Sequence, residues 1–525
     1  MKATLLKSLA PRLANGTGFL TGLRRSRAFR LSGFKSQASG FFFALAALCA
    51  MPSARAAVET WVGNTSADLS GANWTGTNNP PISGDSWIFG TAGSSGTTLN
   101  NGLTANMSVA GITFNAGGSA YTIGGNAITL TGNIADNFVG TETLNFNMAT
   151  TAVRTLTTAS GSTLVLGGNV TGTGGLTTAG TGAVSLAGTN TYTGLTTLSG
   201  GTLNLDFSAA TAPTSNLIAA GNTVTTGAAN LMASLNLQGT AGNAPMKLNL
   251  IGKAGTANTQ AFAGVYASVG MTYLNLTPGA SGGSLAVQLG NIRTTSNALG
   301  SFDISLPAGA TATTAAVNSN GILSQVTVNG NTWATSAATT LTVASTTTTT
   351  NIVNVASGAP ANGKQIQFST IPTGSGLIAN STYYVVGSNG STQFQLATTP
   401  GGTAIALTTS SAAGTAGVEG ALTGLSSYTT TFGTGSSNVD VTSSGALTAN
   451  INSLRFNTAS ANTLTLSTLR GVASGGILVT SAVGANTSTI SGGALSGAFR
   501  RGFGIFQNNT SGDLQIDSTL AENGG

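Results

Sequence analysis

The sequence contains no histidine and a single cysteine, and these absences exclude most common catalytic and metal-binding arrangements. Ser-His-Asp catalysis, Cys-His catalysis and histidine-ligated zinc all need an imidazole. The one cysteine, Cys49, lies within the first 56 residues, which excludes thiolate chemistry, iron–sulfur clusters and disulfides from the rest of the chain. We therefore predict that the protein is not an enzyme and has no catalytic, cofactor-binding or metal-binding residues and no cofactor.

Charged residues are also scarce, at 6% of the chain, compared with roughly 25% in an average protein. Nine of the 18 basic residues lie in the first 56 positions. The remaining chain has nine basic and 12 acidic residues, a formal charge of −3. Nucleic-acid binding needs clustered Lys and Arg, and after position 56 only Arg500 and Arg501 are adjacent. We predict no nucleic-acid partner.

The N-terminal segment lacks an apolar run long enough to cross a bilayer, which takes about 20 residues. Its apolar stretch, Phe41–Met51, follows a basic region and precedes Ala54-Arg-Ala56, a small-x-small cleavage pattern. We predict that residues 1–56 are a secretory signal peptide cleaved after Ala56 or one residue later, and that the protein is extracellular or at the cell surface. A short membrane anchor is the alternative.

Glycine and alternating apolar residues are abundant instead. The chain has 75 glycines and is 40% hydrophobic, whereas disordered chains are poor in apolar residues. Leu, Val and Ile alternate with Thr, Ser and Asn, which is the strand period. Equivalent side chains of stacked parallel strands lie about 4.8 Å apart, so like charges would repel and uncharged polar residues are favoured. Repetitive β-structure is therefore expected.

The segment from Val184 to Leu205 has the clearest pattern, an alternating strand, a Gly/Asn-rich turn and a second alternating strand. The apolar positions Leu130, Leu166, Leu186 and Leu205 are 36, 20 and 19 residues apart. Coils of about twenty residues fit the later spacings, and the first interval could hold two shorter coils. The predicted fold is all-β, a parallel β-helix or solenoid.

This segment also resembles the autotransporter-associated β-strand repeat of bacterial secreted passenger proteins. The resemblance rests on eleven positions: Leu186, Gly188, Asn190, Thr191, Tyr192, Thr193, Gly194, Thr196, Gly201, Thr202 and Leu203. It implies a right-handed parallel β-helix in an exported, cell-surface passenger, with an outer-membrane translocator as partner if the protein is an autotransporter. We predict that these residues have a structural role in the repeat.

The mature chain divides by pattern into five predicted regions. They are an N-terminal cap (57–120), autotransporter-type repeats (121–210), β-rich solenoid with long loops (211–340), an inserted small β-module (341–412) and a solenoid continuation (413–525). The cap contains Trp61, Trp74 and Trp87, for which a buried core or a sugar-binding face are the alternatives. The last region is expected either to be truncated or to belong to a protein exported by another route.

The function expected from these features is that of a non-catalytic structural or adhesion protein, contacting glycans or neighbouring cell surfaces. A carbohydrate-active β-helix enzyme is one alternative, because a glycosidase needs only two converging carboxylates. The acids are dispersed in the sequence, apart from Asp513 and Asp517. A tail-fibre-like binding protein is the second alternative.

Overall fold

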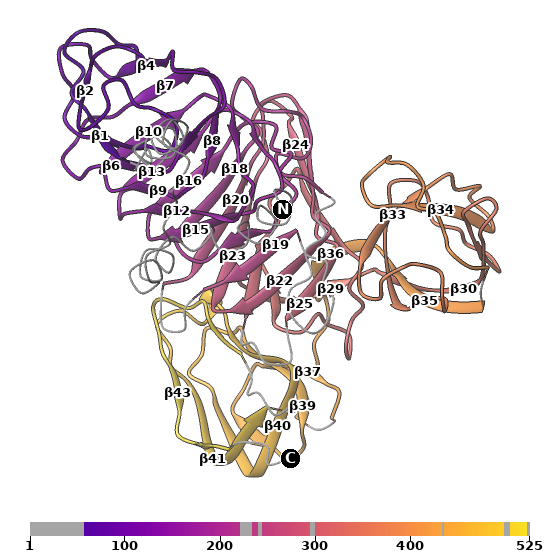
Figure 1. Ribbon diagram of the computed structural model, residues 1–525. Coiled ribbons are helices and arrows are strands. Elements are labelled where there is room, and N and C mark those ends of the chain that lie inside the picture. Colours follow the sequence, from indigo (N-terminus) through magenta and orange to yellow (C-terminus); the bar gives the residue numbers. More distant parts are fainter. Residues whose placement is uncertain are drawn as a thin grey trace, which may run out of the picture. The chain divides into compact units, whose positions relative to one another are not determined.

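The computed structural model describes residues 57–220, 234–239, 244–294, 300–410, 412–432, 435–497 and 504–521 (Figure 1). The described chain is all-β, with large and mostly parallel sheets. Its one helical element in these ranges is a 3-10 turn, Ser481–Val483. The predicted signal peptide, residues 1–56, and the Arg500-Arg501 pair lie outside the described residues.

Sheet 1 contains eleven strands of the described chain, and only its edge strand β2 runs antiparallel to its neighbour. In spatial order the strands are β2 (Trp74–Thr75), β1 (Val58–Trp61), β3 (Ser86–Phe89), β6 (Gly111–Phe114), β9 (Ile134–Asp136), β12 (Arg154–Thr158), β15 (Leu176–Gly180), β17 (Thr196–Leu198), β19 (Leu235–Gln238), β22 (Gly264–Val269) and β25 (Asn291–Thr294).

Sheet 2 contains fifteen strands in the same ranges, in two parallel blocks that β36 and β29 join by antiparallel pairing. In spatial order they are β21 (Ala257–Ala261), β24 (Ser284–Gln288), β27 (Ala310–Thr314), β36 (Gly420–Gly424), β29 (Thr332–Ser336), β28 (Val326–Val328), β26 (Ser301–Ser305), β23 (Met271–Thr277), β20 (Met246–Ile251), β18 (Thr202–Asp206), β16 (Ala183–Leu186), β13 (Ser162–Leu166), β10 (Gly140–Leu144), β7 (Thr122–Gly125) and β4 (Thr98–Asn101).

Sheet 3 is short and parallel. In the N-terminal part the chain passes through the three sheets in turn before it returns to the first, and we call one such passage a circuit. The four described strands of sheet 3 are β14 (Val170–Thr171), β11 (Met148–Ala149), β8 (Ile128–Leu130) and β5 (Met107–Val109). From β3 to β16 the chain visits sheets 1, 2 and 3 in turn, so that each circuit adds one strand to each sheet. Strands β10, β13, β16, β18 and β20 consequently lie side by side (Figure 1).

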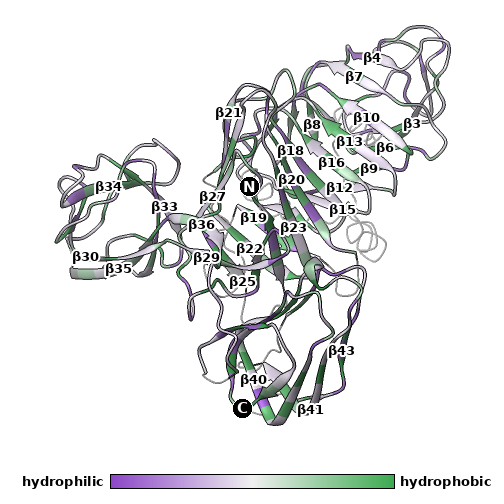
Figure 2. Cartoon of the chain, turned by 180° about the vertical axis from the view of Figure 1, so that it is seen from behind, coloured by the Kyte–Doolittle hydropathy of each residue, from purple (hydrophilic) through white to green (hydrophobic). Residues whose placement is uncertain are grey.

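The core of these sheets is built by in-register stacking of aliphatic residues. Leu144, Leu166, Leu186 and Leu205 pair successively across β10, β13, β16 and β18, and all four are buried. Polar residues alternate with them along each strand, as the hydropathy colours of β20 and β23 indicate (Figure 2). Such burial stabilises by roughly 1.5–3 kcal/mol per large aliphatic side chain.

One sequence-based assignment was wrong. The spacing series groups Leu130 with Leu166, Leu186 and Leu205, and Leu130 is buried as they are, but it lies on β8 of sheet 3 and pairs with Val109. The residue that precedes Leu166 in the column is Leu144. The error arose because a circuit has three strands, so an apolar residue one circuit earlier can face the core from a different sheet.

The outward positions of β18, β20 and β23 include a row of uncharged amides. On sheet 2, the side-chain amide of Asn249 donates to Asn204 Oδ1 at 2.8 Å, and that of Asn275 donates to Asn249 Oδ1 at 2.9 Å. These three residues are paired in register on β18, β20 and β23. Amide groups stacked in this way satisfy one another along the sheet, which explains how a chain with few charges covers its surface with polar groups.

Six strands between Thr339 and Val418 close into a barrel. Their spatial order is β30 (Thr339–Thr347), β31 (Ile352–Val355), β34 (Gln393–Ala397), β33 (Thr382–Val386), β32 (Gln365–Thr370) and β35 (Ala412–Val418). All pairs in it are antiparallel, and its first and last strands, β30 and β35, pair with each other. The barrel encloses its own buried cluster, which includes Ile366, Phe368 and Phe394.

The C-terminal described strands form a further parallel sheet of eight strands. Its main path is β37 (Asn438–Val441), β39 (Ile451–Phe456), β40 (Thr463–Val479), β41 (Ser488–Gly497) and β43 (Leu514–Ile516), and its side strands are β38 (Gly445–Leu447), β42 (Ile505–Gln507) and β44 (Thr519–Leu520). This sheet has its own core, around Leu454 and Ile490. The predicted domain boundaries at 120, 210, 340 and 412 stay predictions.

Replacing Gly194 with Ala should destabilise the protein. A Cβ atom at this position would lie 2.3 Å from Gly175 N and 2.4 Å from the carbonyl carbon of Gly174, both backbone atoms of the preceding circuit. Overpacking of this kind costs about 1–3 kcal/mol. Gly124→Ala is the matched control, because a Cβ on Gly124 meets no atom within 4 Å. Urea denaturation should separate the two variants; equal midpoints would contradict the close approach.

Candidate functional site

The eleven residues of the repeat motif lie between the end of β16 and the start of β18. Leu186 ends β16, the residues from Gly188 to Gly194 lie in the turn before β17, and Thr196 begins β17. The last three lie in the next turn and in β18: Gly201, Thr202 and Leu203. Leu186 and Leu203 are buried in sheet 2, and Gly201 has a positive φ of 62°. Thr191 and Thr193 are exposed, and their backbone N–H groups donate to Val170 O and Gly172 O of the preceding circuit. The turn thus stacks on β14, where a further strand of sheet 3 would otherwise lie.

Asn190 has a specific bonding role in this turn. Its side chain is 1% exposed. Its Oδ1 accepts a hydrogen bond from Val170 N at 2.8 Å, and its Nδ2 donates to Gly188 O at 3.0 Å and Leu217 O at 2.9 Å. The buried side-chain amide therefore links the backbone at Val170, Gly188 and Leu217. Its own oxygen and nitrogen are both hydrogen-bonded, as is usual for buried polar groups.

Tyr192 is the aromatic residue of the same motif, and it is fully buried. Its hydroxyl lies 2.6 Å from the Oγ1 atom of Thr196, which is buried as well. Thr202 continues into β18, paired with Ala183 and Lys247. Gly188 completes the motif at another close approach, since a Cβ there would lie 2.3 Å from Gly168 O. These contacts are internal to the fold.

The four tryptophans are core residues. Trp61, Trp74, Trp87 and Trp333 are each at most 2% exposed. Trp61 and Trp74 pack edge to face with ring centroids 5.1 Å apart, and Trp74 contacts Phe89 at 5.7 Å. The alternative of a Trp-lined sugar-binding face is therefore wrong, because these rings are not accessible to a ligand.

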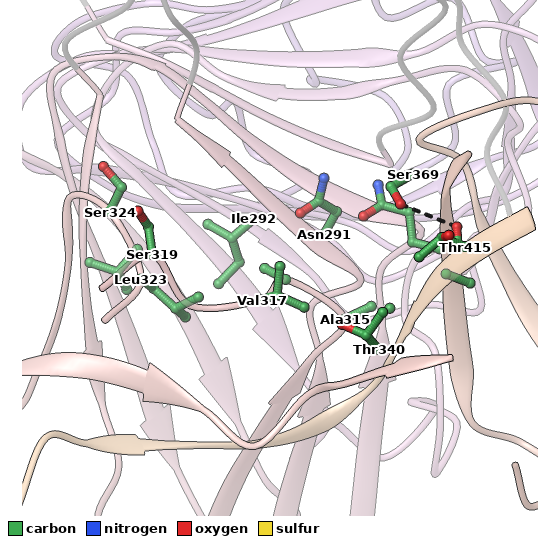
Figure 3. Close-up of a pocket in the computed structure, with 15 residues that line it drawn as sticks. Asn291, Ile292, Ala315, Val317, Ser319, Leu323, Ser324, Thr340, Ser369 and Thr415 are labelled. Atoms are coloured by element: carbon green, nitrogen blue, oxygen red, sulfur yellow. Dashed lines mark hydrogen bonds between the residues drawn. The ribbon is translucent and has the colours of Figure 1, made fainter. Parts of the chain in front are cut away.

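A pocket of about 390 Å³ lies between the parallel sheets and the barrel (Figure 3). One wall comes from β25 and from the segment that follows β27, and the other from β30, β32 and β35. The residues that line it are Asn291, Ile292, Ala315, Ala316, Val317, Ser319, Leu323, Ser324, Val326, Thr340, Gln367, Ser369, Thr415, Ala416 and Gly417.

The lining offers amide, hydroxyl and aliphatic groups. Ile292 and Val317 lie near the middle of the view, with Asn291 above them, and Ser369 and Thr415 lie at the barrel side (Figure 3). Ser369 Oγ donates to Thr415 O at 3.2 Å. Since every lining residue is uncharged, the pocket can bind through hydrogen bonds and apolar contact. Small-molecule sites commonly occupy about 300–1,000 Å³.

A buried glutamine fixes the barrel against the parallel sheets beside this pocket. Gln365, on β32, is fully buried. Its Oε1 accepts from Gly290 N at 2.7 Å, and its Nε2 donates to Phe262 O at 2.9 Å and to the hydroxyl of Tyr384 at 3.0 Å. The same hydroxyl donates to Ala220 O at 3.3 Å, and burial raises the pKa of Tyr384 far above its usual range. Both walls of the pocket are thereby held in place.

Glu419 forms a second polar link at this junction. Its carboxylate lies 3.5 Å from Lys364 Nζ and accepts hydrogen bonds from Gln288 Nε2 at 3.2 Å and from Thr313 Oγ1 at 3.4 Å. The lysine side chain is 41% exposed, so the ion pair contributes little, on the order of 0–1 kcal/mol. The hydrogen bonds to a buried carboxylate are the stronger part of the link.

Sequence analysis did not predict this pocket. Its walls come from residues separated by up to about 125 positions, and they meet only because the barrel returns to the sheets through Gln365 and Glu419. Threonine and serine are common throughout the chain, so Ser369 and Thr415 carry no distinguishing local signal.

No group of three or more His, Cys, Asp or Glu side chains in the described part of the chain is placed to hold a metal ion. No helix there has the length and apolar character needed to span a membrane.

No family model, curated protein or solved structure matches this chain. The resemblance to the autotransporter-associated repeat therefore rests on the eleven motif residues alone.

Replacing Gln365 with Leu should destabilise the protein by about 1–3 kcal/mol, because Gly290 N, Phe262 O and the Tyr384 hydroxyl would lose buried hydrogen bonds. Gln393→Leu is the matched control. The side chain of Gln393 is exposed and donates to Asn354 Oδ1, so an effect within about 0.5 kcal/mol is expected. Free energies of unfolding from urea titrations compare the two variants, and similar values would refute the role assigned to Gln365.

Proposed function

We propose that the chain is an exported, cell-surface structural and adhesion protein, built as a right-handed parallel β-helix with a β-barrel inserted into it. The observation that carries the proposal is the in-register column of aliphatic residues through Leu144, Leu166, Leu186 and Leu205. A column of this kind extends by repetition, because each circuit contacts only its neighbours, and it can support a surface built of many circuits. In this proposal the repeat motif is the turn that keeps successive circuits in register.

The surface chemistry supports a passive role. The amide ladder of Asn204, Asn249 and Asn275 presents neutral hydrogen-bonding groups along sheet 2. Neutral glycans and the surfaces of neighbouring cells offer complementary hydroxyl groups, so contacts with them need no charge. An outer-membrane translocator is the export partner in this proposal, as the repeat resemblance implies.

The pocket between the sheets and the barrel is the contact site that we assign to a neutral glycan. Its lining combines amide and hydroxyl groups, such as Asn291 and Thr415, with the aliphatic surface of Ile292 and Val317. A hydroxyl-rich ligand can exchange hydrogen bonds with the first group and place C–H surface on the second. Charged ligands would lose hydration in this pocket without gaining an opposite charge.

Export should produce a mature protein that begins at Ala57. Expression of the full chain in a Gram-negative bacterium, followed by N-terminal sequencing of the extracytoplasmic product, tests this. Replacing Ala54 and Ala56 with Lys should abolish processing, because the peptidase needs small residues at these positions. Ala47→Leu, within the apolar stretch, is the control and should be processed normally. An extracytoplasmic product that still carries residues 1–56 would contradict the predicted cleavage of the signal peptide.

Glycan binding should depend on the pocket. Ser369→Trp places a large side chain in the pocket lining and should weaken binding to a neutral-glycan array at least about tenfold, equivalent to about 1.4 kcal/mol. Thr370→Trp is the control, because Thr370 is exposed, adjacent in sequence and outside the lining. Equal glycan binding by both variants would show that the pocket is not the glycan-binding site. Cleavage of a glycan by the wild-type protein would favour a carbohydrate-active enzyme instead.

A further inference from the structure

Asp136 and Glu142 are buried among the N-terminal circuits, as are Glu59 and Asp85 nearer the start of the described chain. Glu142 is the middle residue of β10 in sheet 2, and Asp136 is the last residue of β9 in sheet 1. Both are 0% exposed. Burial of an ionised carboxylate is costly unless it is paired, and neither residue forms an ion pair within the described part of the chain.

Glu142 occupies a position that is aliphatic in the following circuits. It pairs in register with Leu164 on β13, which pairs with Val184 on β16. Beyond these two, the column consists of Leu203, Leu248, Leu274, Ile304 and Val328. A leucine at position 142 would continue the column, so the carboxyl group is an exception within an otherwise apolar core.

Asp136 is a similar exception on the other sheet. Its register partners are Phe114 on β6 and Thr158 on β12, both buried. Phe114 stacks on Phe89 with ring centroids 5.3 Å apart, and Phe89 lies 5.3 Å from the ring of Tyr121. In the stacking order of sheet 1, Asp136 therefore lies next to a cluster of aromatic rings.

Each carboxyl group has one oxygen that is hydrogen-bonded and one that is not. Glu142 Oε2 accepts from Tyr121 N at 2.7 Å, and Asp136 Oδ1 accepts from Phe138 N at 3.1 Å. Glu142 Oε1, Asp136 Oδ2 and the Tyr121 hydroxyl are buried without a hydrogen-bond partner among the described residues. An unmet buried polar atom costs about 1–3 kcal/mol, and an unpaired buried charge costs more, so protonation of a carboxyl group removes the larger of the two costs.

The electrostatics agree with a protonated pair. Burial raises the pKa of Asp136 to about 6, although the hydrogen bond from Phe138 N acts to lower it. Burial also raises the pKa of Glu142 to about 8; the bond from Tyr121 N lowers it, and the charge of Asp136 raises it. Burial, followed by the charge of Glu142, raises the pKa of Tyr121 to about 12.

The neighbouring strands provide no compensating charge. Glu142 packs beside β7 and β13, and Asp136 beside β6 and β12. Arg154 of β12 is the charged residue on these four strands, and its Nε donates to Leu130 O at 3.1 Å. Tyr121, directly before β7, is the other titratable group that faces the pair.

We propose that Asp136 and Glu142 together retain a proton at neutral pH, and that this carboxyl pair makes the N-terminal circuits a pH-sensitive element that loosens as the pH rises. In the unfolded chain both groups ionise near pH 4. Stability from the raised values is fully present below that pH and declines as the pH rises through about 6 for Asp136 and about 8 for Glu142.

Hydrogen exchange in the full-length protein tests the proposal locally. Between about pH 6 and 8 the native pair retains one proton that the unfolded chain releases, so opening should become about tenfold more favourable per pH unit. Protection factors for β9 and β10, corrected for intrinsic exchange rates, should fall by this factor. A constant protection factor over this range would overturn the proposal.

Three variants keep the test decisive. Glu142→Gln keeps the shape and removes the titrating group, and Glu142→Leu restores the aliphatic column; both should abolish the pH dependence at β9 and β10. Asp513→Asn is the control, because Asp513 is exposed and remote in sequence, and it should retain the wild-type slope. If one position-142 variant does not fold, the other gives the result. A slope that persists in either folded variant would assign the pH effect to another group, such as the buried Asp303.

Discussion

Aliphatic side chains that stack in register from one parallel strand to the next are the contact on which the rest of this structure depends. Each circuit buries its leucines or valines on those of the circuit before it, so a circuit gains its core only when its neighbour is present. The backbone must then approach closely at the turns, which explains the glycines at positions such as 188 and 194. Polar residues are left for the outer face, where stacked amides satisfy one another.

The barrel is attached to the parallel sheets by a different kind of contact. The barrel has its own core, and it joins the parallel sheets through polar side chains, chiefly Gln365 and Glu419. Hydrogen bonds of this kind are directional, so they define the relative position of the two walls of the uncharged pocket. Apolar stacking therefore accounts for the extent of the sheets, and buried polar contacts account for the one pocket that we connect with binding.

The sequence predicted an all-β chain because the alternation of apolar and polar residues around Leu186 and Leu203 is a local signal of strand structure. It could not assign Leu130 correctly, because alternation within a strand does not tell which of three sheets the strand joins. The pocket could not be predicted from the sequence for a related reason, since Ser369 and Asn291 come together only through long-range packing. The buried acids did leave a signal. Glu142 lies two residues before Leu144 and Asp136 two residues after Ile134, so strand parity places each acid on the inward face.

The pairing of β30 with β35 has a consequence for how such a protein can change. Because the barrel's first and last strands are neighbours, and β29 and β36 outside it pair in the same way, the chain leaves and rejoins the sheets at almost one point. A segment that is connected through two adjacent antiparallel strands can be lengthened, exchanged or lost as a unit. The strand register of the sheets on either side of it is then preserved. The inserted barrel can thus vary in sequence and length independently of the sheets to which it is attached.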